Sequence, residues 1–174
     1  RIVADMDTTR QRIRTLSTLM AQHDAPLMLI ASAAAVAQKT IARGTFESRT
    51  HKLEMGQRID LDELVGLWRG MGYKVEPTVD VPGLVSRRGG ILDIYPLGAD
   101  APARIELWGD EIDSIRLFDP ETQRSTEMVD SVTIIPAQET LPGLTGRADL
   151  DMMLGKIDLG NCTAAARERI REEI

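Results

Sequence analysis

Two short stretches of this sequence combine residue types that could do chemistry on phosphates or metal ions. Gly155-Lys156 is the kind of pair that ends a phosphate-binding loop, and Asp110-Glu111 is an acidic pair that could hold a divalent metal. A phosphate-binding loop requires another glycine five residues earlier and a serine or threonine directly after the lysine. Leu150 and Ile157 occupy those positions, so we expect no nucleotide site there. Trp108-Gly109 precedes Asp110, which predicts a turn at the acidic pair.

The histidines and the cysteine could support zinc binding or nucleophilic catalysis only if the fold brought them together. His23, His51 and Cys162 are far apart in the sequence, and the two histidines are not four residues apart as a helical pair would be. Zinc sites use short ligand spacings, and no motif supports a serine or cysteine triad. We therefore expect a non-catalytic chain without cofactor or metal, whose histidines are solvated or cap helices.

Residues 104–108, RIELW, suggest a different kind of chemistry, which is the recognition of a protein. In a strand the side chains alternate between two faces, so Ile105 and Leu107 point one way while Arg104 and Trp108 point the other. The apolar pair must face the core, which leaves Arg104 and Trp108 on the solvent face. Arginine and tryptophan are enriched among the residues that dominate protein interfaces. The alternative is that Trp108 covers its own sheet edge or a neighbouring segment.

The stretch Arg87-Arg88-Gly89-Gly90 adds basic residues beside this strand. The glycine pair predicts a hairpin turn or a bulge. Side-chain parity cannot be carried across two glycines, but one of the two arginines should share the face of Trp108. With a net charge of -6 on the chain, this patch suits a protein partner better than nucleic acid.

The elements that must position this patch follow from hydrophobic spacing. Residues 8–22 are predicted to form a helix and residues 27–31 a buried parallel strand. This segment is too small to bury a parallel strand by itself, so we expect the other strands of that sheet in sequence outside this chain. Asp60 and Glu63 form a capping box that opens a second helix, and short strands separated by turns fill residues 73–136. We therefore predict an α+β fold, in which a small antiparallel sheet packs against one helix.

Length and composition agree with this assignment. The 174 residues are 43% hydrophobic and contain no apolar run that could span a membrane. The single cysteine fits a reducing cytoplasm. The first residues carry neither an initiator methionine nor a targeting signal, so we expect a fragment of a longer cytoplasmic protein.

Three motifs in order, RRGGILDIYP, ARIELWGDEIDSIRLFDPETQR and VTIIPA, resemble the UvrB-homology module of bacterial transcription-repair coupling factors. The excision protein UvrB shares this domain, but its hairpin and its DPLTG turn differ from Gly89-Gly90 and DPETQR. The resemblance implies a UvrB domain-2-like α+β domain over residues 48–138. It also implies an incomplete RecA-like α/β segment over 1–47 and a mostly helical subdomain beginning at 139.

The resemblance further implies a partner and its contact residues. The module docks onto UvrA, the damage-recognition ATPase, and Arg88, Arg104, Trp108 and Lys74 match its contact positions. The aromatic is usually phenylalanine, and Ser86 stands where UvrB has an arginine. RNA polymerase and DNA would be bound by other domains of the full-length ATP-dependent translocase. The alternatives are a fragment of a UvrB-type excision subunit and a module that binds nucleic acid directly.

Overall fold

The structure, a computed structural model, describes residues 6–21, 26–38 and 40–139. Four helices lie in these ranges: α1 (Met6–Met20), α2 (Ala33–Ala37), α3 (Arg43–Arg49) and α4 (Leu61–Gly70). The strands are β1 (His51–Glu54), β2 (Lys74–Val75), β3 (Leu84–Arg88), β4 (Ile91–Ile94), β5 (Ala103–Trp108), β6 (Glu111–Phe118), β7 (Ser125–Met128) and β8 (Ser131–Ile134). The helical subdomain expected beyond residue 139 lies outside the described residues. Within the described part of the chain, no helix is long and apolar enough to cross a membrane.

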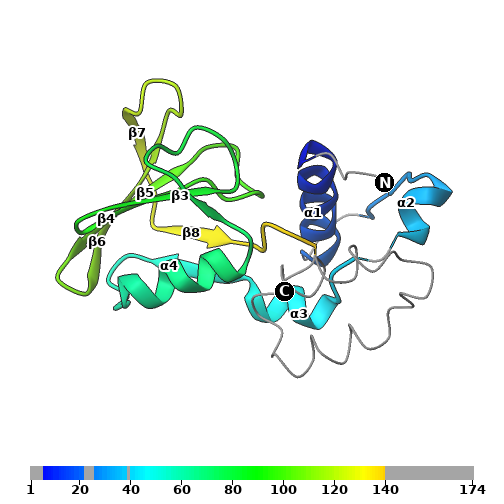
Figure 1. The fold of residues 1–174 in the computed structure, drawn as a ribbon, viewed down its shortest axis with the longest axis horizontal. Coiled ribbons are helices and arrows are strands. Elements are labelled where there is room, and N and C mark those ends of the chain that lie inside the picture. The colour runs from blue at the N-terminus through cyan, green and yellow to red at the C-terminus, as the bar shows by residue number, and fades with distance from the viewer. Residues whose placement is uncertain (1–5, 22–25, 39, 140–174) are drawn as a thin grey trace, which may run out of the picture. The chain divides into compact units, whose positions relative to one another are not determined.

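Six strands form one sheet in the order β2-β3-β4-β5-β6-β7, and β1 pairs with β8 in a second, two-stranded sheet (Figure 1). All neighbours are antiparallel except β2 and β3, because the loop over residues 76–83 brings the chain back in the same direction. The remaining strands follow one another as hairpins, as the turn spacing predicted. The α+β fold predicted from the sequence is confirmed.

Helix α4 covers one face of the large sheet. Its amino terminus is capped by Asp60, whose side chain accepts hydrogen bonds from the backbone of Asp62 and Glu63. Leu64, Trp68 and Met71 are buried along one stripe, as their helical spacing predicted. Sheet residues that point toward this stripe are buried as well: Val85, Leu92, Ile94, Ile105 and Ile115. This packing forms the core and leaves the opposite sheet face to polar side chains.

Trp68 contacts a histidine in the core. The indole Nε1 donates a hydrogen bond to Nε2 of His51 at 2.9 Å, and the two rings stack with centroids 6.3 Å apart. The prediction that His51 is solvated or caps a helix holds for one ring nitrogen: Nδ1 lies 3.3 Å from the carbonyl oxygen of Arg49, the last residue of α3. The other nitrogen, Nε2, is the acceptor that the buried indole N–H requires. Burial lowers the pKa of His51. His23 lies outside the described residues.

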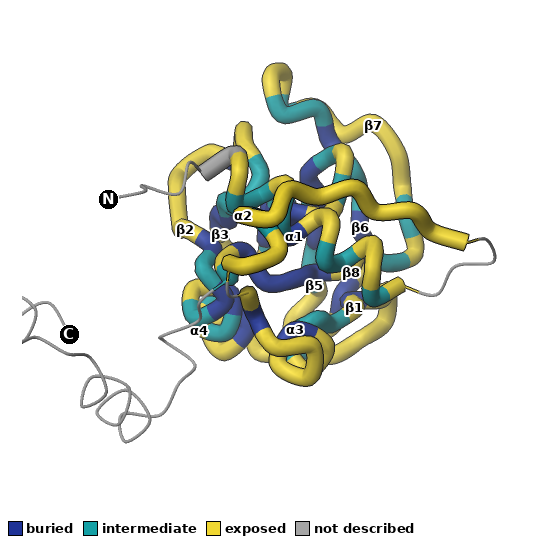
Figure 2. The backbone as a smooth tube through the Cα atoms, turned by 90° about the vertical axis from the view of Figure 1, so that its right-hand side faces the viewer, coloured by how far each residue is buried: buried dark blue, intermediate teal, exposed yellow. Residues whose placement is uncertain are grey.

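The sequence predicts that residues 27–31 form a parallel strand whose neighbouring strands lie outside this chain, and the described residues do not test that prediction. These residues are extended but pair with no strand in the described part of the chain, and all of them are exposed (Figure 2). Met28 and Ile30 are 86% and 89% exposed. A strand that is buried on both faces needs neighbouring strands for its backbone groups. Ser32 does cap the helix that follows, by accepting a hydrogen bond from Ala35 N.

The His51–Trp68 contact predicts that the fold loses stability in mild acid. The folded state binds a proton on His51 more weakly than the unfolded chain, whose histidine titrates near 6.5. The contribution of His51 to the free energy of unfolding is therefore complete above about pH 6.5 and falls as the pH drops toward the lowered pKa. Urea unfolding at several pH values should show this loss for the parent chain. In His51→Gln the amide oxygen can still accept from the indole but does not titrate, so that component should be missing.

If the difference in unfolding free energy between the two proteins does not change with pH, the neutral histidine is not what satisfies Trp68. Other titrating groups are common to both chains, so they cancel in this difference.

Candidate protein-binding face

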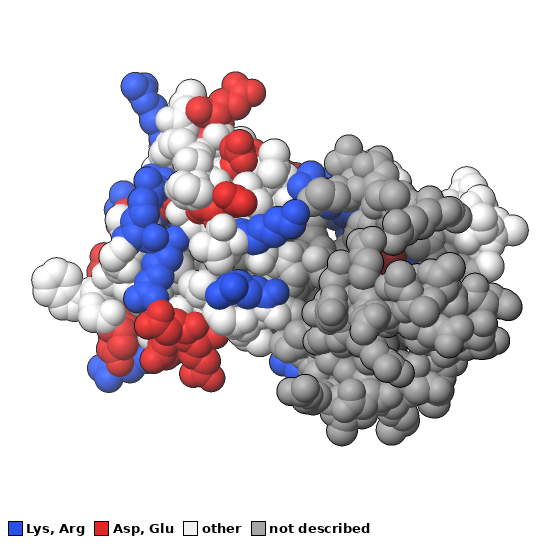
Figure 3. Space-filling view, viewed as in Figure 1, with Lys and Arg blue, Asp and Glu red and all other residues white. Residues whose placement is uncertain are grey.

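The register of β3 to β6 assembles polar residues on the sheet face opposite α4. Cross-strand partners lie on the same face, which produces one row of Ser86, Asp93, Arg104 and Arg116 and a second row of Arg88, Ile91, Glu106 and Ser114. We call this surface the arginine face. Although the chain is acidic overall, basic side chains also gather into a band over the sheet on the side shown in Figure 3.

Asp93 organises the arginine face. Its carboxylate is only 2% exposed and accepts hydrogen bonds from Arg104 Nε at 2.7 Å and Arg104 Nη2 at 2.9 Å. Arg88 Nη2 donates to the same carboxylate at 2.7 Å. A buried carboxylate is costly unless charged donors surround it. Asp93 therefore fixes two arginines from neighbouring strands in one arrangement.

The two arginines differ in how much of their side chains reaches solvent. Arg104 is 17% exposed, because its guanidinium is bound by Asp93 and lies over the Phe118 ring at 4.8 Å. Its hydrogen bonds to Asp93 raise the pKa of Arg104 further. Arg88 is 59% exposed and retains donors that face solvent. Arg88 is therefore the more accessible of the pair.

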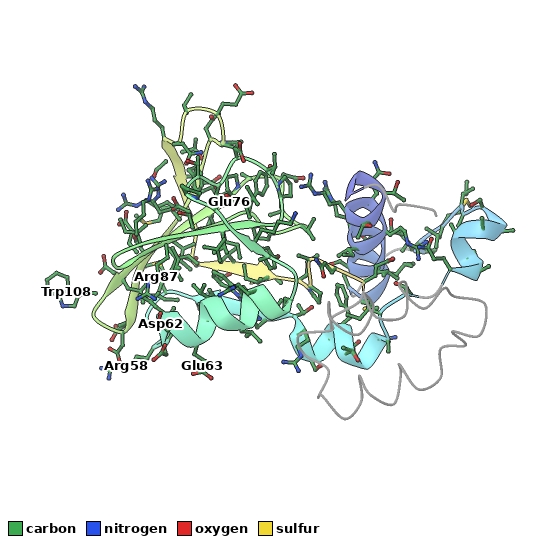
Figure 4. All side chains as sticks on the ribbon, viewed as in Figure 1. Arg58, Asp62, Glu63, Glu76, Arg87 and Trp108 are labelled. Carbon is green, nitrogen blue, oxygen red and sulfur yellow. The ribbon has the colours of Figure 1, made fainter. Side chains whose placement is uncertain are left out.

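Arg87 lies on the opposite face from Arg88. Its guanidinium forms an ion pair with Asp62 in the first turn of α4 (Figure 4). The sequence left open which of the two arginines shares the face of Arg104, and the pairing of β3 with β4 assigns Arg88 to it.

Each of the two glycines between β3 and β4 is required for a different physical reason. Gly89 adopts a φ of 61°, which side chains with a Cβ rarely tolerate. A Cβ on Gly90 would lie 3.3 Å from the carbonyl oxygen of Leu107, whose N–H donates to the Gly90 carbonyl. The tight hairpin thus places Arg88 at its tip, beside the strand that ends at Trp108.

Trp108 projects from the end of the β5–β6 hairpin (Figure 4). It is 84% exposed, which confirms the expectation that its side chain faces solvent. The expected turn at Gly109-Asp110 is confirmed too. Trp108 is two residues after Glu106 on β5, so alternation along this strand predicts that the indole lies on the side of Arg104, about 13 Å along the strand from it.

Residues 56–59 form backbone hydrogen bonds with the hairpin that carries Trp108. Ile59 N donates to the Asp110 carbonyl, and Ile112 N donates to the Gln57 carbonyl. Arg58 lies within 4 Å of carboxylate oxygens of both Asp110 and Glu111. These contacts hold the strand ends while leaving the indole free of any side-chain hydrogen bond described for the chain.

Lys74 is not part of the Asp93 cluster. It is exposed on the edge strand β2, opposite Leu84, at the far end of β3 from Arg88. Four residues of strand correspond to about 13 Å. Ser86 is buried beside Asp93 and donates to the Pro77 carbonyl, so it is a structural residue in this chain.

Two residues of the arginine face were missed in the sequence. Asp93 stands alone among apolar residues in ILDIY, and a charge inside an apolar strand is the signal that could have identified it. Arg116 follows the buried Ile115 and lies directly opposite Arg104. Among the described residues, no group of histidine, cysteine and acidic side chains has the arrangement of a metal site.

The Asp93 cluster predicts unequal effects of removing two carboxylates. Asp93→Ala should lower the free energy of unfolding by about 3 kcal/mol, because it leaves Arg104 partly buried without its anion. Asp62→Ala removes the partner of Arg87, but Asp62 is 85% exposed, so its loss should cost less than about 1 kcal/mol. Denaturant unfolding of both variants measures the difference. Equal effects would show that Asp93 does not hold the face together.

Comparisons with known proteins place this geometry in a family. The sequence model of the UvrB interaction domain matches residues 51–139, which contain β1 to β8 and α4. Transcription-repair-coupling factor of Bacillus subtilis is 34% identical over 173 residues, or 98% of this chain and 14% of that protein. The protein of the same name in Myxococcus xanthus is 35% identical over 113 residues, or 65% of this chain and 9% of its own length.

The corresponding factor of Staphylococcus haemolyticus is 48% identical over 87 residues, which is 50% of this chain and 7% of that protein. The chain therefore spans only a small part of these relatives. The match of the domain covers half of the chain and includes the whole arginine face, and on this evidence the chain belongs to the UvrB interaction domain family.

Proposed function

We propose that this chain is the part of a bacterial transcription-coupled repair factor that recruits UvrA, and that it acts by binding and not by catalysis. The proposal is supported by the exposed indole of Trp108 at the end of β5, the strand that also carries Arg104, which Asp93 fixes together with Arg88. The relatives are named transcription-repair-coupling factors, which supports the repair context.

An exposed tryptophan next to prearranged arginines is suited to a protein surface. The indole can bury a large apolar area in a partner at little cost in side-chain entropy. Arg88 offers donors for a carboxylate, and its hydrogen bond to Asp93 reduces the entropy that it would lose on binding. Such a surface combines an apolar anchor with charge complementarity.

The four proposed contact residues have different roles on this surface. Trp108 is the anchor, and Arg88 is the accessible charge. Arg104 is mostly covered, so it contributes to binding through its positive charge and by orienting the Asp93 carboxylate. Lys74 lies apart on β2 and would contact the edge of a large interface. Residues 48–138 would constitute the UvrA-binding domain, with 1–47 and 139–174 belonging to flanking domains.

The remaining activities of the relatives would reside outside this chain. Contacts with RNA polymerase and with DNA are proposed for other parts of a full-length coupling factor. Direct binding of nucleic acid by this chain is less favoured, because its net charge of -6 opposes the approach of phosphates.

Replacement of Trp108 is the cleanest test, because the side chain is 84% exposed and the core does not depend on it. Trp108→Ala should weaken UvrA binding by about 2 kcal/mol, roughly thirtyfold, without changing the unfolding transition. Trp108→Phe keeps an aromatic anchor and should retain most of the affinity. Calorimetry or surface-immobilised UvrA measures each dissociation constant.

A matched control is Val36→Ala, which also removes an exposed apolar side chain, 75% exposed, from α2. Its affinity should equal that of the parent chain. The proposal fails if the parent chain does not bind UvrA, or if Trp108→Ala binds it as tightly as the parent does.

A further inference from the structure

Arg116 on β6 is an arginine of the same face whose hydrogen-bonding capacity is not used within the described residues. It lies directly opposite Arg104 in the β5–β6 register. Two like charges in this position repel each other. Asp93 neutralises Arg104 through two hydrogen bonds, whereas no carboxylate in the described part of the chain forms a hydrogen bond with Arg116.

The surroundings of Arg116 supply only weak compensation. Its Nη2 lies 3.7 Å from a Glu106 carboxylate oxygen, which is beyond hydrogen-bond distance, and that same oxygen accepts a hydrogen bond from Ser114. The Nε of Arg116 is buried and has no hydrogen-bond partner among the described residues. A buried, unpaired donor is costly. Because the side chain is still 39% exposed, an acceptor from outside can reach its guanidinium.

The charges of the arginine face also favour an anionic ligand. Arg88, Arg104 and Arg116 are accompanied by two carboxylates, Asp93 and Glu106, so one guanidinium charge is uncompensated within these rows. Arg116 is the arginine with the weakest partner. The face therefore complements an anionic group placed over β6.

An exposed apolar side chain lies next to Arg116. Met128 on β7 is its cross-strand partner and is 59% exposed. Phosphates of nucleic acid gain no favourable contact from an apolar side chain beside them. An acidic residue on a protein, by contrast, is commonly flanked by apolar side chains at an interface. Methionine is also well suited to irregular protein surfaces.

We infer that Arg116 binds an aspartate or glutamate side chain of the protein partner, with Met128 packing beside that contact, so that the docking surface extends from Trp108 across β6 to β7. This inference rests on the proposed function and adds a charge contact to it. The bound carboxylate accepts hydrogen bonds from the part of the Arg116 guanidinium that reaches solvent and relieves its repulsion with Arg104.

The test compares Arg116→Gln with Arg69→Gln, which removes the same charge from an exposed position on α4, on the other side of the sheet. Arg116→Gln should weaken UvrA binding at least about fivefold, and Arg69→Gln should leave it unchanged. Arg116→Lys keeps the charge but not the planar fork, so its affinity should be intermediate. Unfolding curves verify that each variant is folded.

Each other outcome contradicts the inference in a distinct way. Unchanged UvrA affinity in Arg116→Gln, together with a loss in Trp108→Ala, overturns the inference and leaves the proposed function intact. An effect of Arg116→Gln on a short DNA duplex but not on UvrA assigns the site to phosphate. Absence of UvrA binding by the parent chain overturns both proposals.

Discussion

The arginine face depends on a single buried carboxylate. Asp93 sits in the middle of β4, almost without solvent, and its oxygens accept hydrogen bonds from Arg104 on β5 and Arg88 on β3. Removing a charge from water is unfavourable unless charged donors replace the solvent. The same carboxylate therefore ties three strands together and orients the two arginines. The two arginines are ordered at the surface because the buried carboxylate requires charged donors.

The two faces of the sheet divide structure from recognition. Alternation along each strand sends the apolar residues toward α4, where Trp68 and Met71 are fully buried. The other face collects the charged residues. A bulge in β6, where two steps from Ser114 to Ile112 match one step from Glu106 to Leu107, shifts the register between β5 and β6 just before the hairpin tip. Trp108 projects from that tip, and Arg58 forms ion pairs with Asp110 and Glu111 of the same hairpin.

The unequal exposure of the arginines changes how substitutions should be interpreted. Arg104 is mostly covered by Asp93 and Phe118, so its replacement disturbs the sheet as well as the surface. Trp108 has no comparable structural role. An effect on partner binding can therefore be assigned to direct contact for Trp108, whereas for Arg104 a change in binding combines contact with alignment of its neighbours.

Much of this fold is determined by short-range pattern. The spacing of apolar residues predicted α4 and its buried stripe, the turn residues predicted the hairpins, and alternation in RIELW predicted the exposure of Trp108. These features depend on neighbours one to four residues apart, so the sequence contains their physical cause. What the sequence did not predict involves partners that are distant along the chain. Residues 27–31 have the composition of a strand but pair with no strand in the described part of the chain.

The same distinction applies to single residues. The assignment of Arg88 and not Arg87 to the arginine face, the burial of Asp93 and the hydrogen bond from Trp68 to His51 each required a register between separate segments. The sequence by itself determined which side chains alternate and where the chain turns. Only the tertiary structure decided which charges meet, because electrostatic pairing and desolvation depend on distance in space and not on separation along the chain.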